Sequence, residues 1–467
     1  VLAPHKNHAD LAALATYADR DASPVIQRLA TLSLVAVLRD LIPAYRIRLP
    51  SAKELTMPVS ADVEALRAYE RNLLRAYEST IATLRGWARD GSDTDEAAAR
   101  RLAAARGLCA LLEKGRDFNA SAALLGALVP LANAADDEVR GMACAGLASL
   151  FTADVRGDAT LEAVQQMAAL IRAASFNVHP QMLECWLHLR VDAGGGPAAA
   201  ASKRSKKRRR NLDVVSREMA LASGEHGDAG SRHSAVLEQV VVSYARIVKR
   251  APQSPLMPLV LRGLSKYGHQ VNIELLLDLL ASLRALLSDP DALAPQAALL
   301  CAHALLQLLS GPGVALAEDT RGVQRRVYGL LADRELFAAE PMLLVTGLDW
   351  GEYLCRHRAQ LLAARAASFS HRLIGLSAEL PQALAIAALA STARLLAAAP
   401  RATSILHGDE DGPVCAAPQA AVATDDPDSS RILSTTAWLL AVLGRHYHPT
   451  LRRIAALLAR NEPLEPE

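Results

Sequence analysis

The chain has 467 residues, of which 51 are Lys or Arg and 49 are Asp or Glu, so its formal net charge at pH 7 is only +2. This near balance excludes a protein that covers nucleic acid with most of its surface, because each phosphate contact needs its own basic side chain. Hydrophobic residues make up 51% of the chain and aromatic residues only 4%. Ala and Leu carry the hydrophobicity, which favours helices over sheets.

The first residues, "VLAPHKNHAD", contain no initiator Met and lack the charged-then-apolar layout of a signal peptide. We therefore expect a segment of a longer protein. The six cysteines stand tens of residues apart, without a C-x-x-C pair. This spacing predicts separate buried thiols in a reducing compartment rather than a zinc site or a redox pair.

The first clear periodic stretch starts at Ser60, a predicted N-cap. Its apolar residues recur in steps of three and four, which predicts an amphipathic helix with one apolar face. They are Val63, Leu66, Tyr69, Leu73, Tyr77, Ile81 and Leu84.

Residues 123–151, "ALLGALVPLANAADDEVRGMACAGLASLF", consist of an apolar helical stretch, a short acidic turn and a second helical stretch. The same layout returns in "VQQMAALIRAASFNVHPQMLECWLHLR", and the step from Val139 to Met182 lies within the roughly 40- to 47-residue period of HEAT arrays. We expect stacked helical hairpins over residues 101–190, with Val139, Leu147, Met182 and Trp186 buried.

Helical periodicity stops between residues 191 and 233, and this stretch predicts a flexible linker. It contains "SKRSKKRRR", a dense basic run made of Lys203, Arg204, Lys206, Lys207, Arg208, Arg209 and Arg210. Without these seven residues the chain has 44 basic against 49 acidic side chains, so its basicity is local. The run is typical of a nuclear import signal or solvated linker, and also of a contact to an acidic partner such as RNA. Both interpretations stay open.

Helices are expected again from residue 234 onward. The window "LPQALAIAALASTARLLAAAP" is largely Ala and is interrupted by Ser391, Thr392 and Arg394, which predicts a buried helix rather than a membrane span. A later stretch, "HGDEDGPVCAAPQAAVATDDPDSS", predicts a solvated acidic surface loop. Its acidic clusters, Asp409 to Asp411 and Asp425 to Asp428, lack the ligand spacing of an EF-hand.

The tetrapeptide "HYHP" places two histidines around a tyrosine before Pro449. Alternating histidines are able to bind a metal, but a sharp entry into a helix starting at Pro449 is the preferred interpretation. Leu451, Ile454, Ala455 and Leu458 are then expected to point inward and the arginines outward. The predicted contacts to a partner or RNA are His446, Tyr447, His448, Arg452 and Arg453.

The sequence contains no glycine-rich phosphate loop and no recognisable catalytic Ser, His and Asp spacing. We therefore predict a protein that is not an enzyme and that holds no cofactor and no metal. The predicted fold is all-α, a HEAT-like helical-repeat solenoid in two parts, residues 1–190 and 234–467, joined by the basic linker of residues 191–233.

Three segments together resemble one family. The first, residues 41–84, contains "YRIR" followed by "SAKEL" and a long helix; the second is the basic run with the helices behind it. The third, "DDPDSSRILSTTAWLLAVLGRHYHPTLRRIAALLAR", is similar to the end of a CCAAT-binding-factor-like domain. The combination resembles the nucleolar complex-associated protein 3 family, although "TAWLL" stands where that family more often has an acidic residue after Trp.

This resemblance implies a non-enzymatic factor of the nucleus and nucleolus. Such a factor pairs with the second nucleolar complex protein and accompanies pre-ribosomal RNA and other assembly factors of the large ribosomal subunit, without membrane or small-molecule substrate. A chromatin-associated replication licensing factor is the alternative, and the HEAT pattern alone also suggests an importin-like adaptor.

Overall fold

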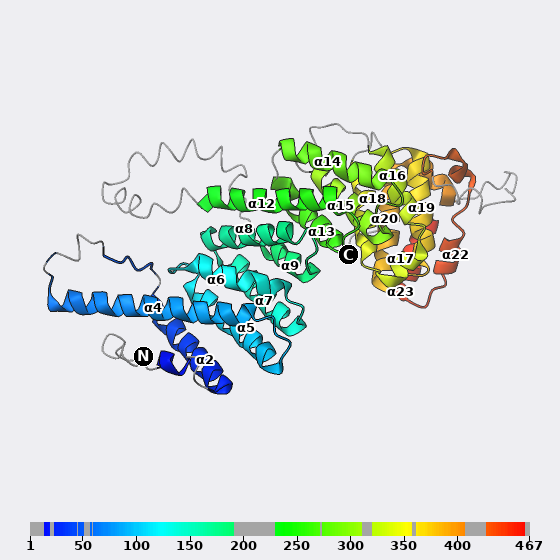
Figure 1. The fold of residues 1–467 in the computed structure, drawn as a ribbon. Helices are drawn as coiled ribbons and strands as arrows, with labels where there is room; N and C mark the ends of the chain where they lie inside the picture. Colours follow the sequence, from blue (N-terminus) through cyan, green and yellow to red (C-terminus); the bar gives the residue numbers. More distant parts are fainter. Residues whose placement is uncertain are drawn as a thin grey trace. The chain divides into compact units, whose positions relative to one another are not determined.

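The structure is a computed structural model that describes residues 14–18, 23–43, 45–50, 57, 59–190, 229–270, 273–310, 320–356, 361–406 and 426–462. Within these ranges every regular element is an α-helix or a 3-10 helix (Figure 1). The chain divides into two compact units, Val1–Tyr244 and Ala245–Glu467. The predicted all-α, helical-repeat fold is confirmed.

Unit 1 is a series of packed helices in which α5 packs against α2, α4 and α7, and α6 packs against α8. Its described elements are α2 (Pro24–Leu41), α4 (Ala61–Arg89), α5 (Asp95–Gly115), α6 (Ser121–Leu128), η1 (Val129–Asn133), α7 (Asp137–Ala153), α8 (Asp158–Ala173), α9 (Pro180–Glu184), η2 (Cys185–His188) and most of α12 (Ala229–Arg250).

The hairpins expected over residues 101–190 are present, with α6 and η1 followed by α7, and α8 followed by α9 and η2. The side chains of Val139, Leu147, Met182 and Trp186 are fully buried, as predicted. Trp186 meets the ring of Tyr244 edge-on, with 5.6 Å between ring centroids. The second hairpin differs from the first because its return helix contains only five α-helical residues and ends as a 3-10 turn.

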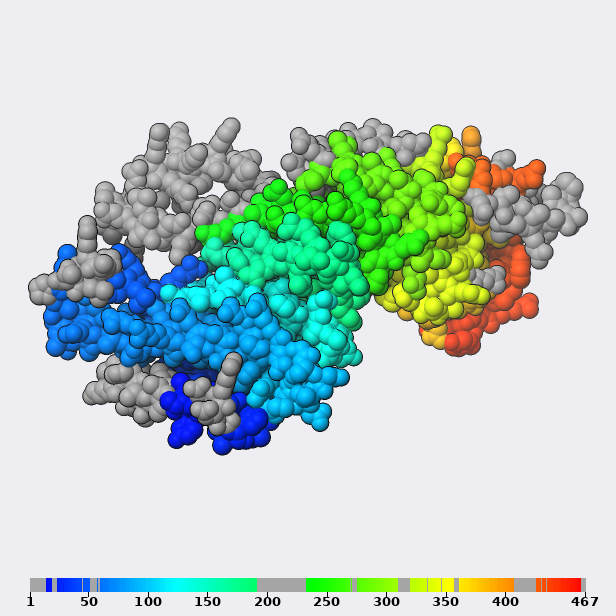
Figure 2. Space-filling view, viewed as in Figure 1, coloured from blue at the N-terminus to red at the C-terminus, as the bar shows by residue number. Residues whose placement is uncertain are grey.

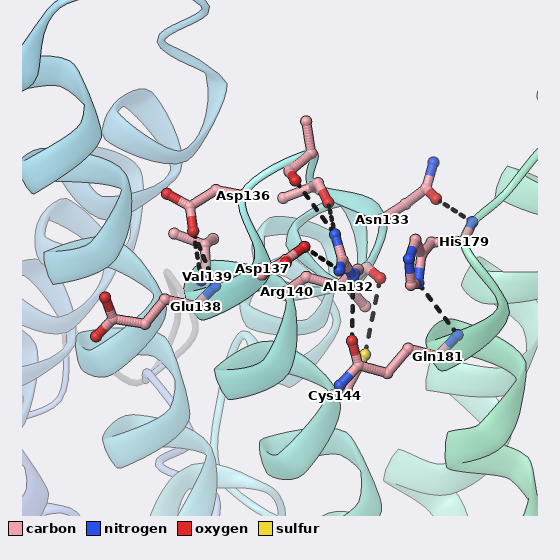
Figure 3. Close-up of polar contacts among 12 residues, drawn as sticks. Ala132, Asn133, Asp136, Asp137, Glu138, Val139, Arg140, Cys144, His179 and Gln181 are labelled. Carbon is pink, nitrogen blue, oxygen red and sulfur yellow. Dashed lines mark hydrogen bonds and ion pairs between the residues drawn. The ribbon is translucent and has the colours of Figure 1, made fainter.

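A buried arginine ties the two hairpins together (Figure 3). Arg140, on the first turn of α7, donates to the carbonyls of Ala134 and Ala135 at 2.9 and 3.2 Å and to Gln181 Oε1 at 3.0 Å. The carbonyls belong to the turn of the first hairpin, and Gln181 belongs to the second. Since buried polar groups are costly unless paired, these bonds fix one hairpin against the next.

Side-chain caps start the helices at the same junction. Asp136 Oδ1 accepts from the backbone N–H groups of Glu138 and Val139 at 2.9 and 3.2 Å, which begins α7. Asn133 Oδ1 accepts from the N–H of His179 at 2.7 Å, and His179 in turn caps α9 (Figure 3). The polar side chains of this region are therefore used for structure.

The predicted linker of residues 191–233 lies almost entirely outside the described residues, and so does the basic run of residues 203–210. Its last residues are helical, because α12 begins at Ala229. Arg232 pairs with Asp158 Oδ1 at 2.8 Å, and His233 is buried against Gly157. Gly157 has φ +81°, and a Cβ there would come within 3.2 Å of the His233 ring, so this contact depends on glycine.

Unit 2 contains a second helical array in which α13 packs on α15, α15 on α18, α18 on α20, and α20 on both α19 and α23. Its elements are α13 (Met257–Tyr267), η3 (Gly268–Gln270), α14 (Ile273–Ser288), α15 (Pro295–Ser310), α16 (Arg321–Leu330), α17 (Arg334–Ala339), α18 (Leu343–Arg356), α19 (Ala363–Ser377), α20 (Gln382–Ala398), η6 (Pro400–Leu406), η7 (Ser430–Ser434), α22 (Leu439–Leu443) and α23 (Pro449–Ala459).

The alanine-rich window of residues 380–400 forms α20, which lies in the core of unit 2 as predicted. Small residues allow close packing there, since a Cβ on Gly351 of α18 would come within 3.0 Å of Ser391 Oγ. Thr392 is buried and donates its hydroxyl to the carbonyl of Ala388 at 2.9 Å, so its polar group is satisfied. None of the helices in the described ranges has the length and apolarity needed to span a bilayer.

Candidate functional site

The "RHYHP" segment forms the turn between α22 and α23. The backbone of His448 is extended, at φ −76° and ψ 121°, and Pro449 is the first residue of α23, as the sequence predicted. His446 Nδ1 accepts from the N–H of His448 at 3.1 Å, and the rings of His446 and Tyr447 lie 4.3 Å apart. Gln382, at the start of α20, donates to the Tyr447 hydroxyl. The turn is thus held by Gln382 of α20 and by its own side chains.

Helix α23 has one buried apolar face and one exposed basic face, as the sequence pattern predicted. Leu451, Ala455 and Leu458 are buried, and Ile454 is half-buried against the same core. Arg452 and Arg453 are exposed. No group of three or more His, Cys, Asp or Glu side chains that could hold a metal occurs in the described part of the chain. This turn is therefore an ordered feature of the surface that presents Tyr447 and the two arginines to solvent.

Two large apolar side chains beside this turn were not identified from the sequence. Trp438, the N-cap of α22, is 59% exposed, and Val442, one helical turn later, is 54% exposed. The segment "AWLLAVL" is apolar on all sides, so periodicity does not reveal which face is buried. In the structure Leu440 and Leu443 point to the core and leave Trp438 and Val442 outside.

The interpretation of the acidic residues before η7 as a solvated loop is wrong for Asp428. Both carboxylate oxygens of Asp428 accept from Arg365 on α19, at 2.7 Å each, and Arg365 is only 2% exposed. Ser368, also on α19, donates to the carbonyl of Pro427 at 3.0 Å. The buried guanidinium requires a carboxylate partner, so Asp428 anchors the chain to α19. Asp409, Glu410, Asp411 and Asp425 lie outside the described residues.

Unit 1 exposes an apolar face at the start of α4, which we call the α4 surface: Val63 and Leu66, with the exposed Val59 just before the helix. These positions continue the stripe that is buried from Leu73 to Leu84, but Val63 is 40% and Leu66 51% exposed. The stripe stays exposed at its start because α4 extends past the helices that cover its C-terminal half (Figure 1). A soluble helix normally ends its apolar stripe with its core, so this surface is suited to a partner.

One cavity of unit 2, of about 510 Å³, lies between α13, α15 and the start of α18. His303 lines it and lies 3.3 Å from Asp349, measured from Nδ1 to Oδ2. Burial lowers the pKa of His303, against the opposing effect of Asp349. Ser265 shares the cavity, but its hydroxyl donates to the carbonyl of Leu261 at 2.9 Å. The Ser265 hydroxyl thus donates within its own helix, and it does not donate to His303 as the nucleophile of a Ser–His pair would.

In the described part of the chain, none of the cysteines forms a disulfide; these are Cys109, Cys144, Cys185, Cys301 and Cys355. Burial raises the pKa of Cys109 to about 11 and that of Cys301 further. Because the thiolate is the reactive form, these two thiols are poor nucleophiles at neutral pH.

Two family models match the chain. A model described as nucleolar complex-associated protein matches residues 1–80, which include α2 and most of α4. A model described as the CBF/Mak21 family matches residues 298–455, which include the Arg365–Asp428 anchor and the His446 turn. A solved structure of an engineered protein is similar at a TM-score of 0.23 and 15% identity over 97% of the chain and 98% of that protein. That score supports no conclusion about the fold.

Curated relatives from animals and plants match nearly the whole chain. A nucleolar complex protein 3 homolog of Mus musculus is 27% identical over 96% of the chain, and one of Xenopus laevis is 28% identical over 96%. A nucleolar complex-associated protein 3 of Arabidopsis thaliana is 26% identical over 94%. The chain spans 58%, 59% and 60% of the length of these three relatives.

Proposed function

Because the chain belongs to the nucleolar complex protein 3 family, we propose that it is a non-enzymatic nucleolar assembly factor that acts on precursors of the large ribosomal subunit. The nucleolar assignment rests on the printed names of its relatives. The role in large-subunit assembly rests on the family resemblance of three sequence segments. On this proposal the two helical units serve as scaffolds, and their exposed surfaces bind the partners.

The observation that carries the scaffold proposal is the α4 surface. Val63 and Leu66 are one helical turn apart on α4, Val59 lies exposed just before the helix, and such an apolar face is suited to receive an amphipathic helix of another protein. The α4 surface lies inside the segment matched by the nucleolar complex-associated model. We propose that its partner is the second nucleolar complex protein, which docks an apolar helix face there.

The remaining sequence predictions enter this proposal unchanged. The basic run of residues 203–210 serves as an import signal, a contact to pre-ribosomal RNA, or both. No cofactor, metal or small-molecule substrate takes part. Catalysis is not required, since bringing a protein partner and an RNA together needs only binding surfaces.

Purification of the tagged chain from cells at low salt tests the function. We expect large-subunit precursor RNA, other assembly factors and the second nucleolar complex protein in the bound fraction. Recovery of origin-binding proteins without precursor RNA would contradict the proposal and support a replication licensing factor. Recovery of transport GTPases would instead support an importin-like adaptor.

A pair of matched variants tests the α4 surface. Leu66→Asp places a charge in the exposed stripe and should lower recovery of the second nucleolar complex protein at least about tenfold, the effect of losing about 1.4 kcal/mol of binding free energy. Val155→Asp is the control, because Val155 is also an exposed apolar residue of unit 1 but lies in the short turn before α8. Equal recovery with both variants would place the partner elsewhere.

A further inference from the structure

The end of unit 2 exposes aromatic and cationic side chains on the same helix. Backbone hydrogen bonds from Ala441 to Trp438, from Arg445 to Val442 and from His446 to Leu443 continue the helical path through the end of α22. Trp438, Val442 and Arg445 therefore lie at i, i+4 and i+7 on one face. Trp438 and Val442 are more than half exposed, and Arg445 is also exposed. In Figure 2 the segment with α22 and α23, orange to red, lies at the surface of unit 2.

A second aromatic side chain is presented by the following turn. Tyr447 is 74% exposed, and it is held in place by the His446 ring at 4.3 Å and by the hydrogen bond from Gln382 to its hydroxyl. A tyrosine fixed in this way loses little rotamer freedom when it binds something. Its exposed surface is therefore a ready platform for a flat partner.

The charged side chains of this region, from residue 429 to residue 460, are all basic. From Ser429 to Arg460 the sequence contains five arginines, two histidines and no Asp or Glu. Arg445, Arg452, Arg453 and Arg460 are exposed in the structure. The carboxylates just before it are already used, since Asp428 holds Arg365 and Asp426 lies 3.3 Å from Arg325. A surface of this composition attracts a polyanion.

We propose that the exposed side chains of α22 (Trp438, Val442 and Arg445), of the following turn (Tyr447) and of α23 (Arg452), which we call the Trp438 surface, bind single-stranded RNA. The proposal rests on the proposed function, which brings the chain to RNA. Unpaired bases stack on aromatic rings while arginines contact the phosphates. Duplex RNA fits less well, because its bases are already stacked and it is bound through its backbone and shape. A protein partner fits less well too, because the charged side chains here are all cations and the basic side chains of a mixed-charge protein surface would find no acidic partner among them.

Binding of a labelled oligouridylate to the purified chain tests this proposal. The basic run of residues 203–210 is first replaced by Ser and Gln, so that its own affinity for RNA does not mask the Trp438 surface. In that background Trp438→Ala should weaken binding about 5- to 100-fold, as expected for the loss of one stacked base. Trp438→Phe should keep most of the affinity, because a phenylalanine ring still stacks on a base. Trp438→Leu should lose it, because leucine has no ring.

Arginine variants test the phosphate contacts. Arg445→Gln should lower the slope of log K against log salt by about 0.7, the value for one phosphate contact on a single strand. The matched control is Arg356→Gln, since Arg356 is also exposed in unit 2 but pairs with Glu352 on its own helix. That control should leave both affinity and slope unchanged. Circular dichroism of each variant establishes that it is folded.

Three results would overturn the proposal. The first is unchanged oligouridylate binding by Trp438→Ala, and the second is equal affinity of Trp438→Phe and Trp438→Leu. The third is binding of a labelled acidic peptide that exceeds binding of the oligouridylate and that Trp438→Ala abolishes, which would make this a protein-docking surface. Co-sedimentation of the unaltered chain with large-subunit precursors tests the proposed function separately, so failure of one can be told from failure of the other.

Discussion

The junction at which Arg140 ties two hairpins of unit 1 together, called here the Arg140 junction, and the His446 turn between α22 and α23 of unit 2 use polar side chains for different ends. At the junction, Arg140 is buried. It donates hydrogen bonds to two backbone carbonyls of its own hairpin and to a glutamine side chain of the next hairpin. At the turn, His446 Nδ1 accepts from the backbone N–H of His448, while Tyr447, Trp438, Arg452 and Arg453 face solvent. The comparison teaches that buried, paired polar groups stabilise this fold. Groups that are held in place but exposed are the ones available to bind partners.

The largest expected effect on stability comes from Trp186, which lies in the second of the two hairpins that Arg140 connects. Trp186→Ala removes a fully buried indole that packs on Tyr244, and should lower the free energy of unfolding of unit 1 by about 3 to 5 kcal/mol. Urea denaturation monitored by circular dichroism measures it. A loss below about 1 kcal/mol would mean that the site collapses without cost or that Trp186 is not in the core.

The anchor between Asp428 and Arg365 comes next. Asp428→Ala leaves the buried Arg365 without its carboxylate and should destabilise unit 2 by about 2 to 4 kcal/mol, somewhat below the range for a wholly buried pair because Asp428 is partly exposed. Thermal melting of the purified chain is the measurement. The control is Glu352→Ala, because Glu352 pairs with the exposed Arg356 on the same helix of unit 2; we expect a loss of less than about 1 kcal/mol.

Arg140→Met keeps the apolar stem of the side chain but removes its donors. The carbonyls of Ala134 and Ala135 and the amide of Gln181 lose these partners, so we expect a loss of about 1 to 3 kcal/mol in unfolding free energy. Arg106→Met is the matched control, because Arg106 is exposed and pairs with Glu138 only at 3.4 Å. Equal small losses for both variants would show that the Arg140 junction is not what couples the hairpins.

The sequence predicted the periodic parts of the fold well and the irregular parts poorly. The helical pattern identified the hairpin core around Val139 and Met182 and the inward face of α23, because each apolar stripe is covered by a neighbouring helix. It did not identify the exposure of Val63 and Leu66, since a stripe in sequence does not say where its covering helices end. Trp438 and Asp428 were missed for related reasons: one lies in a short segment apolar on all sides, and the partner of the other is 63 residues away.

Trp438→Ala is the counterpart of Trp186→Ala and should have little effect on stability. Because Trp438 is mostly exposed, we expect a change of less than about 0.5 kcal/mol in the free energy of unfolding. The same urea denaturation provides the number. A loss comparable to that of Trp186→Ala would place Trp438 in the fold rather than on a binding surface.

The smallest expected effect comes from the basic run. Replacing its seven basic residues by Ser or Gln should leave the melting temperature nearly unchanged, because a dense run of like charges has no apolar face to pack. Fusion of an unrelated import signal to this variant separates its two interpretations. Full rescue of ribosome assembly would eliminate an RNA contact, and restored nuclear entry without assembly would support it.

The central claim is that the exposed surfaces, and not the stability of the fold, connect this chain to its partners. The most direct measurement is gradient sedimentation of cell extracts containing a Leu66→Asp, Trp438→Ala double variant whose purified form melts like the unaltered chain. We predict that the variant leaves the large-subunit precursor fractions and sediments near the top of the gradient. Undiminished sedimentation of this folded variant with those precursors would contradict the claim.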